Sequence, residues 1–371
     1  MVAVCRFFGL LASMEEPASP ALTAAVLIAG TVSLAVLFRL FQIHIDGRPL
    51  LPYEPRRAAP WNALAPLLML APVMIPLGRA LVGWGAVAEE PSPLAFVTAL
   101  ALSAAGAAPA AAYGGAAAAS LVDGIALASA KAESMPLLLV ESAAVTILLA
   151  LACYALLGVA FGATRRDLGL PADGRQALRD IRVGAIAFAA SLAPIYGALL
   201  ALNLAFPSDQ AHPLIEELVV HHSPAMMAAA ALMAVVAAPL YEETAFRLVL
   251  QGWLERRESP SSSGASPAGD GRQDDSHAAG EPTGEPDGGA GGVPGGQTLP
   301  KRATWGPVVL SGTLFGLAHT GQGLAPAPLV LLGFVLGYVY QRTHRILPCI
   351  VCHMLFNGYT FLMLSLQFAS R

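Results

Sequence analysis

Seven residues in otherwise apolar stretches of this sequence have types and spacings that could do chemistry. A carboxylate beside imidazoles in an apolar setting can activate water, either as a general base or by sharing a metal ion. An amide or a ring N–H can donate a hydrogen bond to a developing oxyanion, so the set could hydrolyse a peptide bond. The residues form three groups, which are Glu242, Glu243 and Arg247, then Phe315 and His319, then His353 and Asn357.

Within each group, the two residues that are four apart lie on one face of a helix. Glu243 and Arg247 can therefore pair, which lowers the cost of burying two charges. Unpaired, each ionisable group costs roughly 2.5–3.5 kcal/mol at membrane depth. Glu242 lies about 100° further round the same helix. We expect Glu242 to face His319 and His353 around a shared water, with Pro239 kinking the helix nearby.

The composition is that of a polytopic, all-α membrane protein. The chain has 371 residues, of which 56% are hydrophobic and only 12% charged, whereas a soluble domain carries about 25% charged residues. The mean hydropathy is +0.61. The net charge of −4 and the lack of a basic tract exclude nucleic acid as an expected partner. Four cysteines in or near apolar segments do not indicate a disulfide framework.

A membrane span needs about 20 largely apolar residues. We expect eight spans, and a ninth if the Ala/Gly-rich 93–121 crosses. Lys and Arg place four connecting loops on the cytoplasmic side, around 43–60, 164–182, 256–302 and 342–345. The loop 207–223 has neither residue and is expected outside. The predicted spans are 21–42, 61–84, 136–162, 182–206, 224–254, 304–322, 325–342 and 346–367.

Residues 258–300 differ from the rest, because they have no aromatic residue and are dense in Gly, Pro, Ser and acidic residues. Such a segment buries too little apolar surface to fold, so we expect a disordered cytoplasmic insertion. The sequence therefore divides into N-terminal membrane helices of unassigned role, 1–163, and a helical bundle, 164–367, that carries the motifs and is interrupted by the insertion.

At these motifs the sequence resembles the CPBP intramembrane protease family, which includes the CAAX-processing Ras-converting enzyme and bacterial relatives. The family pattern is EExxxR, FxxxH and HxxxN on successive helices, and all three occur here in order. The resemblance covers about 180–367. It departs from the pattern at Leu248, where the family often has Gly, and in the insertion 258–300.

The resemblance implies a role for each residue. Glu242 and His319 would activate water, while His353 and Asn357 would stabilise the oxyanion. The family has been described as metalloproteases and as glutamate proteases, so the cofactor stays open between none and one divalent ion such as Zn²⁺. Its ligands would be Glu242, His319 and His353. Supporting roles fall to Glu243, Arg247 and Phe315.

The expected protein is thus an intramembrane endopeptidase acting on a membrane-associated protein or peptide, with CAAX-type C-terminal processing as one form. We expect it in a bacterial inner membrane, in contact with the lipid bilayer, with its site open to the cytoplasm; the oligomeric state stays open. Two other classes compete, a catalytically silent scaffold or immunity-type protein and a proton-coupled transporter. The stretch from Cys349 to His353 also matches a haem-attachment pattern, although small packing cysteines explain it better.

Overall fold

The computed structural model describes residues 20–71, 124–206, 223–258, 304–320 and 324–368. Every element within these ranges is a helix, which confirms the all-α prediction. The predicted segments 93–121 and 259–300 lie outside the described residues, as does 61–84 beyond a short helix at 64–71. The remaining predicted spans can be compared with the structure directly.

Five stretches are long and apolar enough to cross a membrane. They agree with five of the eight predicted spans, while the full count of eight is not confirmed. The composite helix Pro224–Glu258 is made of α9, η2, α10, η3 and α11 in succession. The five stretches are Pro20–Ile45 in α2, Met135–Phe161 in α6, Gly174–Ala205 in α7, the composite helix, and Leu347–Leu366 in α14.

The predicted spans 304–322 and 325–342 form a helical hairpin, and neither is among the five stretches that are long and apolar enough to cross. α12 (Gly306–Leu317) has only 12 residues and α13 (Pro326–Thr343) has 18, which corresponds to about 18 and 27 Å of helix. The two helices pack tightly because Gly312 meets Gly333; a Cβ on Gly333 would lie 2.5 Å from the Gly312 carbonyl oxygen. His319 lies just beyond the end of α12, at the tip of this hairpin.

α7 (Gly174–Ala205) begins eight residues before the predicted start at 182, so part of the predicted loop is helical. A capping box explains the earlier start. The Asp173 carboxylate accepts a hydrogen bond from the Gln176 backbone N–H, 2.7 Å away, and the Gln176 side chain accepts one from the Ala172 N–H, 2.6 Å away. The spacing of Asp173 and Gln176 is visible in the sequence, but the arginines around it favoured the prediction of a loop.

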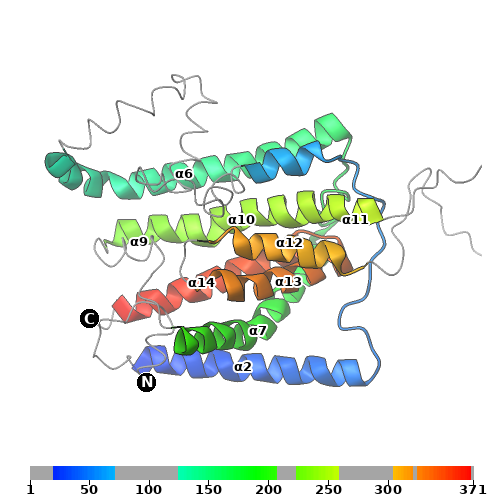
Figure 1. Ribbon diagram of the computed structural model, residues 1–371, viewed down its shortest axis with the longest axis horizontal. Coiled ribbons are helices and arrows are strands. Elements are labelled where there is room, and N and C mark those ends of the chain that lie inside the picture. The colour runs from blue at the N-terminus through cyan, green and yellow to red at the C-terminus, as the bar shows by residue number, and fades with distance from the viewer. Residues whose placement is uncertain (1–19, 72–123, 207–222, 259–303, 321–323, 369–371) are drawn as a thin grey trace, which may run out of the picture.

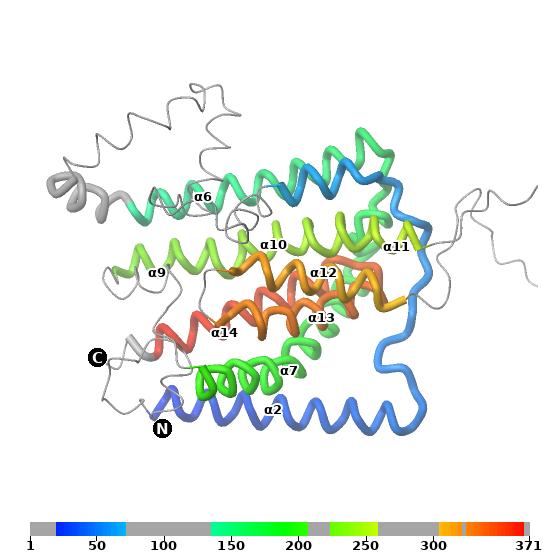
Figure 2. Tube along the Cα trace, viewed as in Figure 1, coloured from blue at the N-terminus to red at the C-terminus, as the bar shows by residue number. Residues whose placement is uncertain are grey.

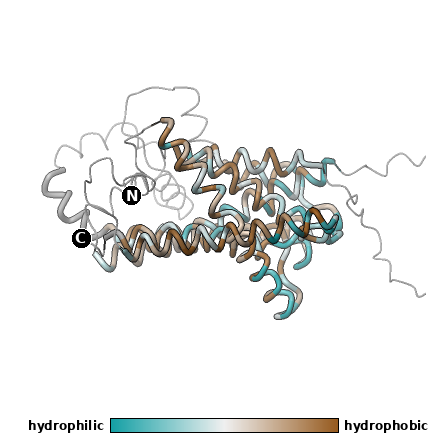
Figure 3. The backbone as a smooth tube through the Cα atoms, turned by 90° about the horizontal axis from the view of Figure 1, so that it is seen from below, coloured by the Kyte–Doolittle hydropathy of each residue, from teal (hydrophilic) through white to brown (hydrophobic). Residues whose placement is uncertain are grey.

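The helices lie roughly side by side, with α6 and α2 on opposite sides of the bundle (Figures 1 and 2). α2 (Pro20–Ile45) packs on α7 and α14 (Leu347–Phe368), and α6 (Gly124–Phe161) packs on α9, η2 and α10. Helices from 1–163 therefore pack directly on the motif-bearing bundle. Seen from below, apolar residues colour the length of the helices, and hydrophilic colour gathers at one end (Figure 3).

The described parts of the loops that were predicted on the cytoplasmic side meet at that end, here called the inner end (Figure 1). Residues 46–63, here called the inner-end strap, run across it from α2 to the helix at 64–71. Many hydrogen bonds join the strap to the rest of the inner end. They include Glu54 N to Arg342 O, Arg342 Nε to Leu51 O, Arg166 Nη2 to Pro55 O, Arg56 Nη1 to the Tyr340 hydroxyl, and Trp61 Nε1 to Val249 O.

An ion pair also ties the strap to the turn between α6 and α7. Arg57 Nε donates to the Asp167 carboxylate at 2.7 Å, and the backbone N–H and hydroxyl of Thr164 donate to it at 2.7 and 2.6 Å. Burial acts to raise the pKa of Asp167, but the hydrogen bonds from Arg57 and Thr164 outweigh it and hold the pKa below its ordinary value. The Asp167 carboxylate is therefore charged at neutral pH.

Candidate active site

The composite helix Pro224–Glu258 is unusual because two π-helical segments flank its acidic motif. η2 (Leu232–Ala237) precedes α10 (Ala238–Glu243), and η3 (Thr244–Gln251) follows it. A π-turn is wider than an α-turn and occurs often at functional sites. Pro239, at the start of α10, lacks an N–H and interrupts the backbone ladder next to η2. The expected disturbance near Pro239 is therefore present.

The two adjacent carboxylates occupy different environments. Glu243 is fully buried and accepts a hydrogen bond from Arg247 Nε at 3.1 Å, as the i,i+4 spacing predicted. Its other oxygen lies 2.8 Å from His353 Nδ1 on α14. Arg247 also donates to the Ser311 hydroxyl on α12, 3.0 Å away, and Ser311 in turn donates to the Phe246 carbonyl. Glu243 is thus a buried link between three helices.

Glu242 faces the two histidines. Its Oε2 atom lies 3.9 Å from His319 Nε2 and 3.8 Å from His353 Nε2. These separations are too long for direct hydrogen bonds and are suited to one bridging water. Oε2 is buried and has no hydrogen-bond partner among the described residues. The Glu242 and His319 side chains are 21% and 17% exposed, against 3% for His353, so the site is open on the side of Glu242 and His319.

Hydrogen bonds at the far side of each imidazole set its tautomer. His319 Nδ1 lies 2.9 Å from the Phe315 carbonyl, which can only accept, so Nδ1 carries the hydrogen. His353 Nδ1 donates to Glu243, which is held as a carboxylate by Arg247. In the neutral form of either ring, Nε2 is then an acceptor directed at Glu242. Three acceptor atoms converge, an arrangement that attracts the protons of a water molecule.

Phe315 and Asn357 hold neighbouring groups in place. The Phe315 ring lies edge-on to His353, with 5.4 Å between ring centroids, and the Arg247 guanidinium lies 4.9 Å from the Phe315 centroid. Asn357 Nδ2 donates to the Ala234 carbonyl in η2, 2.8 Å away. An amide nitrogen carries two hydrogens, so the second N–H of Asn357 can serve another acceptor.

One carboxylate and two imidazoles are ligands that Zn²⁺ accepts. Among the described residues, however, no group of three or more His, Cys, Asp or Glu side chains is already arranged as the ligands of a metal ion. The Nε2 to Oε2 separations of 3.8 and 3.9 Å are shorter than the sum of two ligand distances of about 2.0–2.2 Å. These separations therefore fit either a bridging water or one ion shared by Glu242, His319 and His353.

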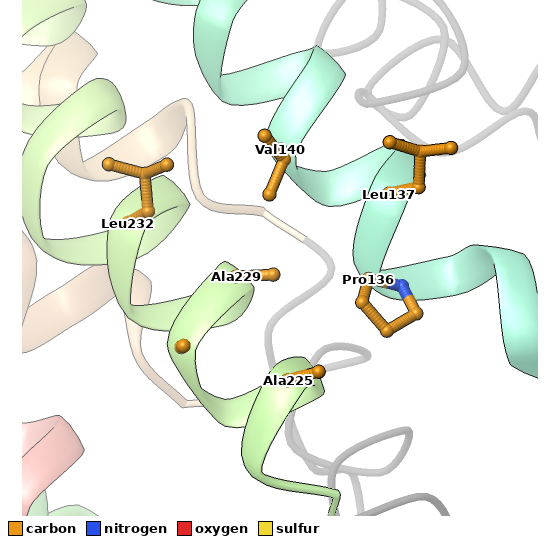
Figure 4. A pocket seen from close by; sticks show the side chains of 7 residues that line it. Pro136, Leu137, Val140, Ala225, Ala229 and Leu232 are labelled. Atoms are coloured by element: carbon orange, nitrogen blue, oxygen red, sulfur yellow. The ribbon is translucent and has the colours of Figure 1, made fainter.

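An apolar groove of about 520 Å³ lies elsewhere, between α6 and α9 (Pro224–Ala231). Pro136, Leu137 and Val140 line one side of it, and Ala225, Ala229 and Leu232 the other (Figure 4). None of the motif residues lines the groove. The groove is lined by apolar residues of two helices and is separate from the motif residues.

A comparison with protein families bears on the motifs directly. Residues 296–359 match the model for type II CAAX prenyl endopeptidases that are Rce1-like. Over this segment the chain is similar to the CAAX protease family. The Rce1-like segment contains Phe315, His319, His353 and Asn357 and confirms the resemblance. No curated protein and no solved structure matches the chain.

The acidic motif lies outside the Rce1-like segment, so Glu242 is assigned to the site by its position in the structure alone. The structure brings together Glu242, His319 and His353, and sets Glu243, Arg247 and Phe315 behind them. Sequence reasoning missed Ser311, which lies four residues before Phe315 on α12 and contacts Arg247. A lone serine in an apolar helix carries no signal of its own, but its spacing from Phe315 and His319 places it on the same face.

Proposed function

We propose that this protein is an intramembrane endopeptidase that hydrolyses a peptide bond of a membrane-associated protein or peptide. The Rce1-like segment implies protease activity of the CAAX type. The observation that supports the site most strongly is the position of Glu242 Oε2 opposite two imidazole nitrogens, where it is buried and has no hydrogen-bond partner within the described ranges. Five helices that are long and apolar enough to cross a membrane support an intramembrane site.

In the proposed reaction, a water bound between Glu242 and the histidines attacks the carbonyl carbon of the peptide. A proton passes from the water, by way of Glu242, to Nε2 of His353, and the carbonyl oxygen becomes an oxyanion. Protonated Nε2 of His353 is then a donor, and with the second N–H of Asn357 it stabilises that oxyanion. The same proton then moves to the amide nitrogen, the C–N bond breaks, and an amine and a carboxylic acid leave.

Two buried contacts support the proposed roles of the histidines in this reaction. Glu243 stays charged beside Arg247, so it can balance a positive charge on His353 after proton uptake. The Phe315 carbonyl similarly holds the hydrogen of His319 on Nδ1. General acid–base groups of this kind contribute about 10²–10⁴-fold to a rate. Glu242→Gln, which keeps the shape and removes the base, should therefore lower the cleavage rate by at least about a hundredfold.

The substrate can be found by comparing membranes that contain the natural protein with membranes that contain Glu242→Gln. Proteins that accumulate uncleaved in the variant membranes are the candidates, and purified protein in proteoliposomes should cleave them. Substrates whose new C-terminal residue is a lipidated cysteine would establish CAAX-type processing. A silent scaffold would show the same membrane proteome with both proteins.

A divalent ion at Glu242, His319 and His353 is the alternative activator of water. Chelation followed by metal analysis decides between the two. Full activity in metal-depleted protein supports direct activation by Glu242 and the histidines. Loss of activity that Zn²⁺ restores, with about one ion per chain, would assign the metal to these three ligands. A proton-coupled transporter would instead acidify proteoliposomes without cleaving any peptide.

We further propose the orientation that the loops indicate, in a bacterial inner membrane with the site open to the cytoplasm. The support is that the Lys- and Arg-containing loops gather at the inner end, where the inner-end strap crosses the bundle. Single cysteines placed at Thr320, near His319, and at Arg48, in the strap, can be treated with a membrane-impermeant reagent in intact cells and again after the membrane is opened. Labelling of both only after the membrane is opened agrees with this orientation.

A further inference from the structure

The backbone of η2 leaves one carbonyl without a donor inside its own helix. In this π segment the hydrogen bonds run from each N–H to the fifth carbonyl before it, as in the bond from the Ala238 N–H to the Met233 carbonyl. The next carbonyl in this register is that of Ala234, and its donor would be the N–H of residue 239. That residue is Pro239, which has no N–H.

Asn357 supplies the missing donor from another helix. Its Nδ2 atom lies 2.8 Å from the Ala234 carbonyl oxygen, 123 residues away in sequence. A carbonyl left unpaired in an apolar interior keeps the full cost of its desolvation. α14 and η2 pack against each other along this contact, and a Cβ added to the neighbouring Gly358 would lie 3.5 Å from a Val235 methyl group. The bond is therefore made across a close helix contact.

Asparagine in a helix can bond within its own helix instead. Asn203 does so in α7, where its Nδ2 donates to the Leu199 carbonyl four residues earlier, at 2.9 Å. Asn357 has the same option towards the His353 carbonyl but reaches across to Ala234. The choice of partner matters because Asn357 lies one turn after His353, and Ala234 lies two turns before Glu242. One hydrogen bond thus joins the two helices that meet at the site.

We propose that Asn357 is a positioning residue that fixes the composite helix against α14 by replacing the N–H that Pro239 lacks. The bond sets the rotation and height of Glu242 relative to His353. This inference rests on the proposed function, but it is distinct from oxyanion stabilisation, because it uses the amide hydrogen that points at Ala234. Its signature is an energetic dependence of Asn357 on Pro239.

A double-mutant cycle tests that dependence. Asn357→Ala is made in the natural protein and in Pro239→Ala, where residue 239 regains an N–H for the Ala234 carbonyl. In the natural protein we expect kcat to fall at least tenfold with KM within twofold, and the unfolding temperature in detergent to fall. In the Pro239→Ala background, Asn357→Ala should lower kcat by at most a third of the fold-change measured in the natural protein. It should also lower the unfolding temperature by less than it does in the natural protein.

Equal losses from Asn357→Ala in both backgrounds, in kcat and in unfolding temperature, would overturn the proposal. Oxyanion stabilisation would then be the only role left for Asn357. If Pro239→Ala is itself too slow to assay, the unfolding temperatures carry the test by the same comparison. Asn203→Ala is the matched control, since it removes a similar bond and should lower the unfolding temperature equally in both backgrounds. A protein without hydrolytic activity would refute the proposed function, while the unfolding cycle would still judge the Asn357 bond.

Discussion

Glu242 and Glu243 are neighbours in sequence with opposite environments. Glu243 is fully buried, paired with Arg247 and bonded to His353, whereas Glu242 is 21% exposed with one oxygen unpartnered. The i,i+4 spacing predicted the Glu243–Arg247 pair correctly, because that contact is local. The bond from His353 to Glu243 and the bond from Asn357 to Ala234 could not be predicted, since they depend on how distant helices rotate against one another.

These environments predict different consequences for two matched substitutions. Glu243→Gln leaves Arg247 buried without its counter-charge, which should lower the free energy of unfolding by about 3–5 kcal/mol. Glu242→Gln, next to it in the chain, should leave the unfolding temperature nearly unchanged while activity is lost. Unfolding temperatures and cleavage rates of the two variants in the same detergent check this. Equal destabilisation by both would contradict the division of roles.

At the scale of elements, the hairpin of α12 and α13 holds His319 beside Glu242, and the proposed function sets both at membrane depth. Backbone outside regular helices is tolerated there only where protein buries it or where it lines a water-filled space. The sequence predicted two full spans because its apolar runs include the residues of the turn. In the structure α12 ends at Leu317, and Gly312 and Gly316 let α13 approach α12 closely.

The hairpin therefore predicts the effect of adding a side chain at Gly333. A Cβ there would lie 2.5 Å from the Gly312 carbonyl oxygen, so Gly333→Ala must push α12 and α13 apart. We expect a loss of about 1–3 kcal/mol in the free energy of unfolding and a clear fall in kcat as His319 moves. Gly197→Ala in α7 is the control, because nothing lies within 4 Å of its added Cβ. Unaltered activity in Gly333→Ala would contradict the hairpin packing.

The inner-end strap predicts a dependence of stability on pH. The pKa of Asp167 is lower in the folded protein than in the unfolded chain, so its ion pair with Arg57 stabilises the fold above the ordinary carboxyl pKa of about 4. That stabilisation is lost as the pH falls from there through the lower, folded value. The unfolding temperature of the natural protein should therefore fall more steeply below about pH 4 than that of Asp167→Asn. Parallel pH curves would show that the ion pair contributes nothing.

At the scale of the whole molecule, hydropathy alone predicted the all-helical membrane bundle and the gathering of basic loops at one end. It could not predict the π segments, because hydrophobic periodicity does not distinguish them from α-helix over one or two turns. Nor could it predict that the strap joins the bundle, since loops carry no periodicity. In the structure Trp61 of the strap donates to the Val249 carbonyl in η3, so the N-terminal part of the chain supports the helix that bears Glu242.

The two ends of the insertion predict that it is dispensable. The Thr304 hydroxyl donates to the Glu258 carboxylate, so the residues that flank 259–303 already touch. Replacing 259–303 by a short Gly/Ser linker should leave kcat and the unfolding temperature close to those of the natural protein. Cleavage assays and thermal unfolding in detergent check this. Complete loss of activity in a protein that still folds would make the insertion a working part of the enzyme.

The central claim is that Glu242, set against His319 and His353 by three helices, activates the water that cuts the substrate. The most direct measurement is the cleavage rate of Glu242→Gln per molecule of folded protein in proteoliposomes, beside the natural protein, on a substrate found from the membrane comparison. We predict a rate at least about a hundredfold lower at an unchanged unfolding temperature. Cleavage by Glu242→Gln at the natural rate would contradict the account.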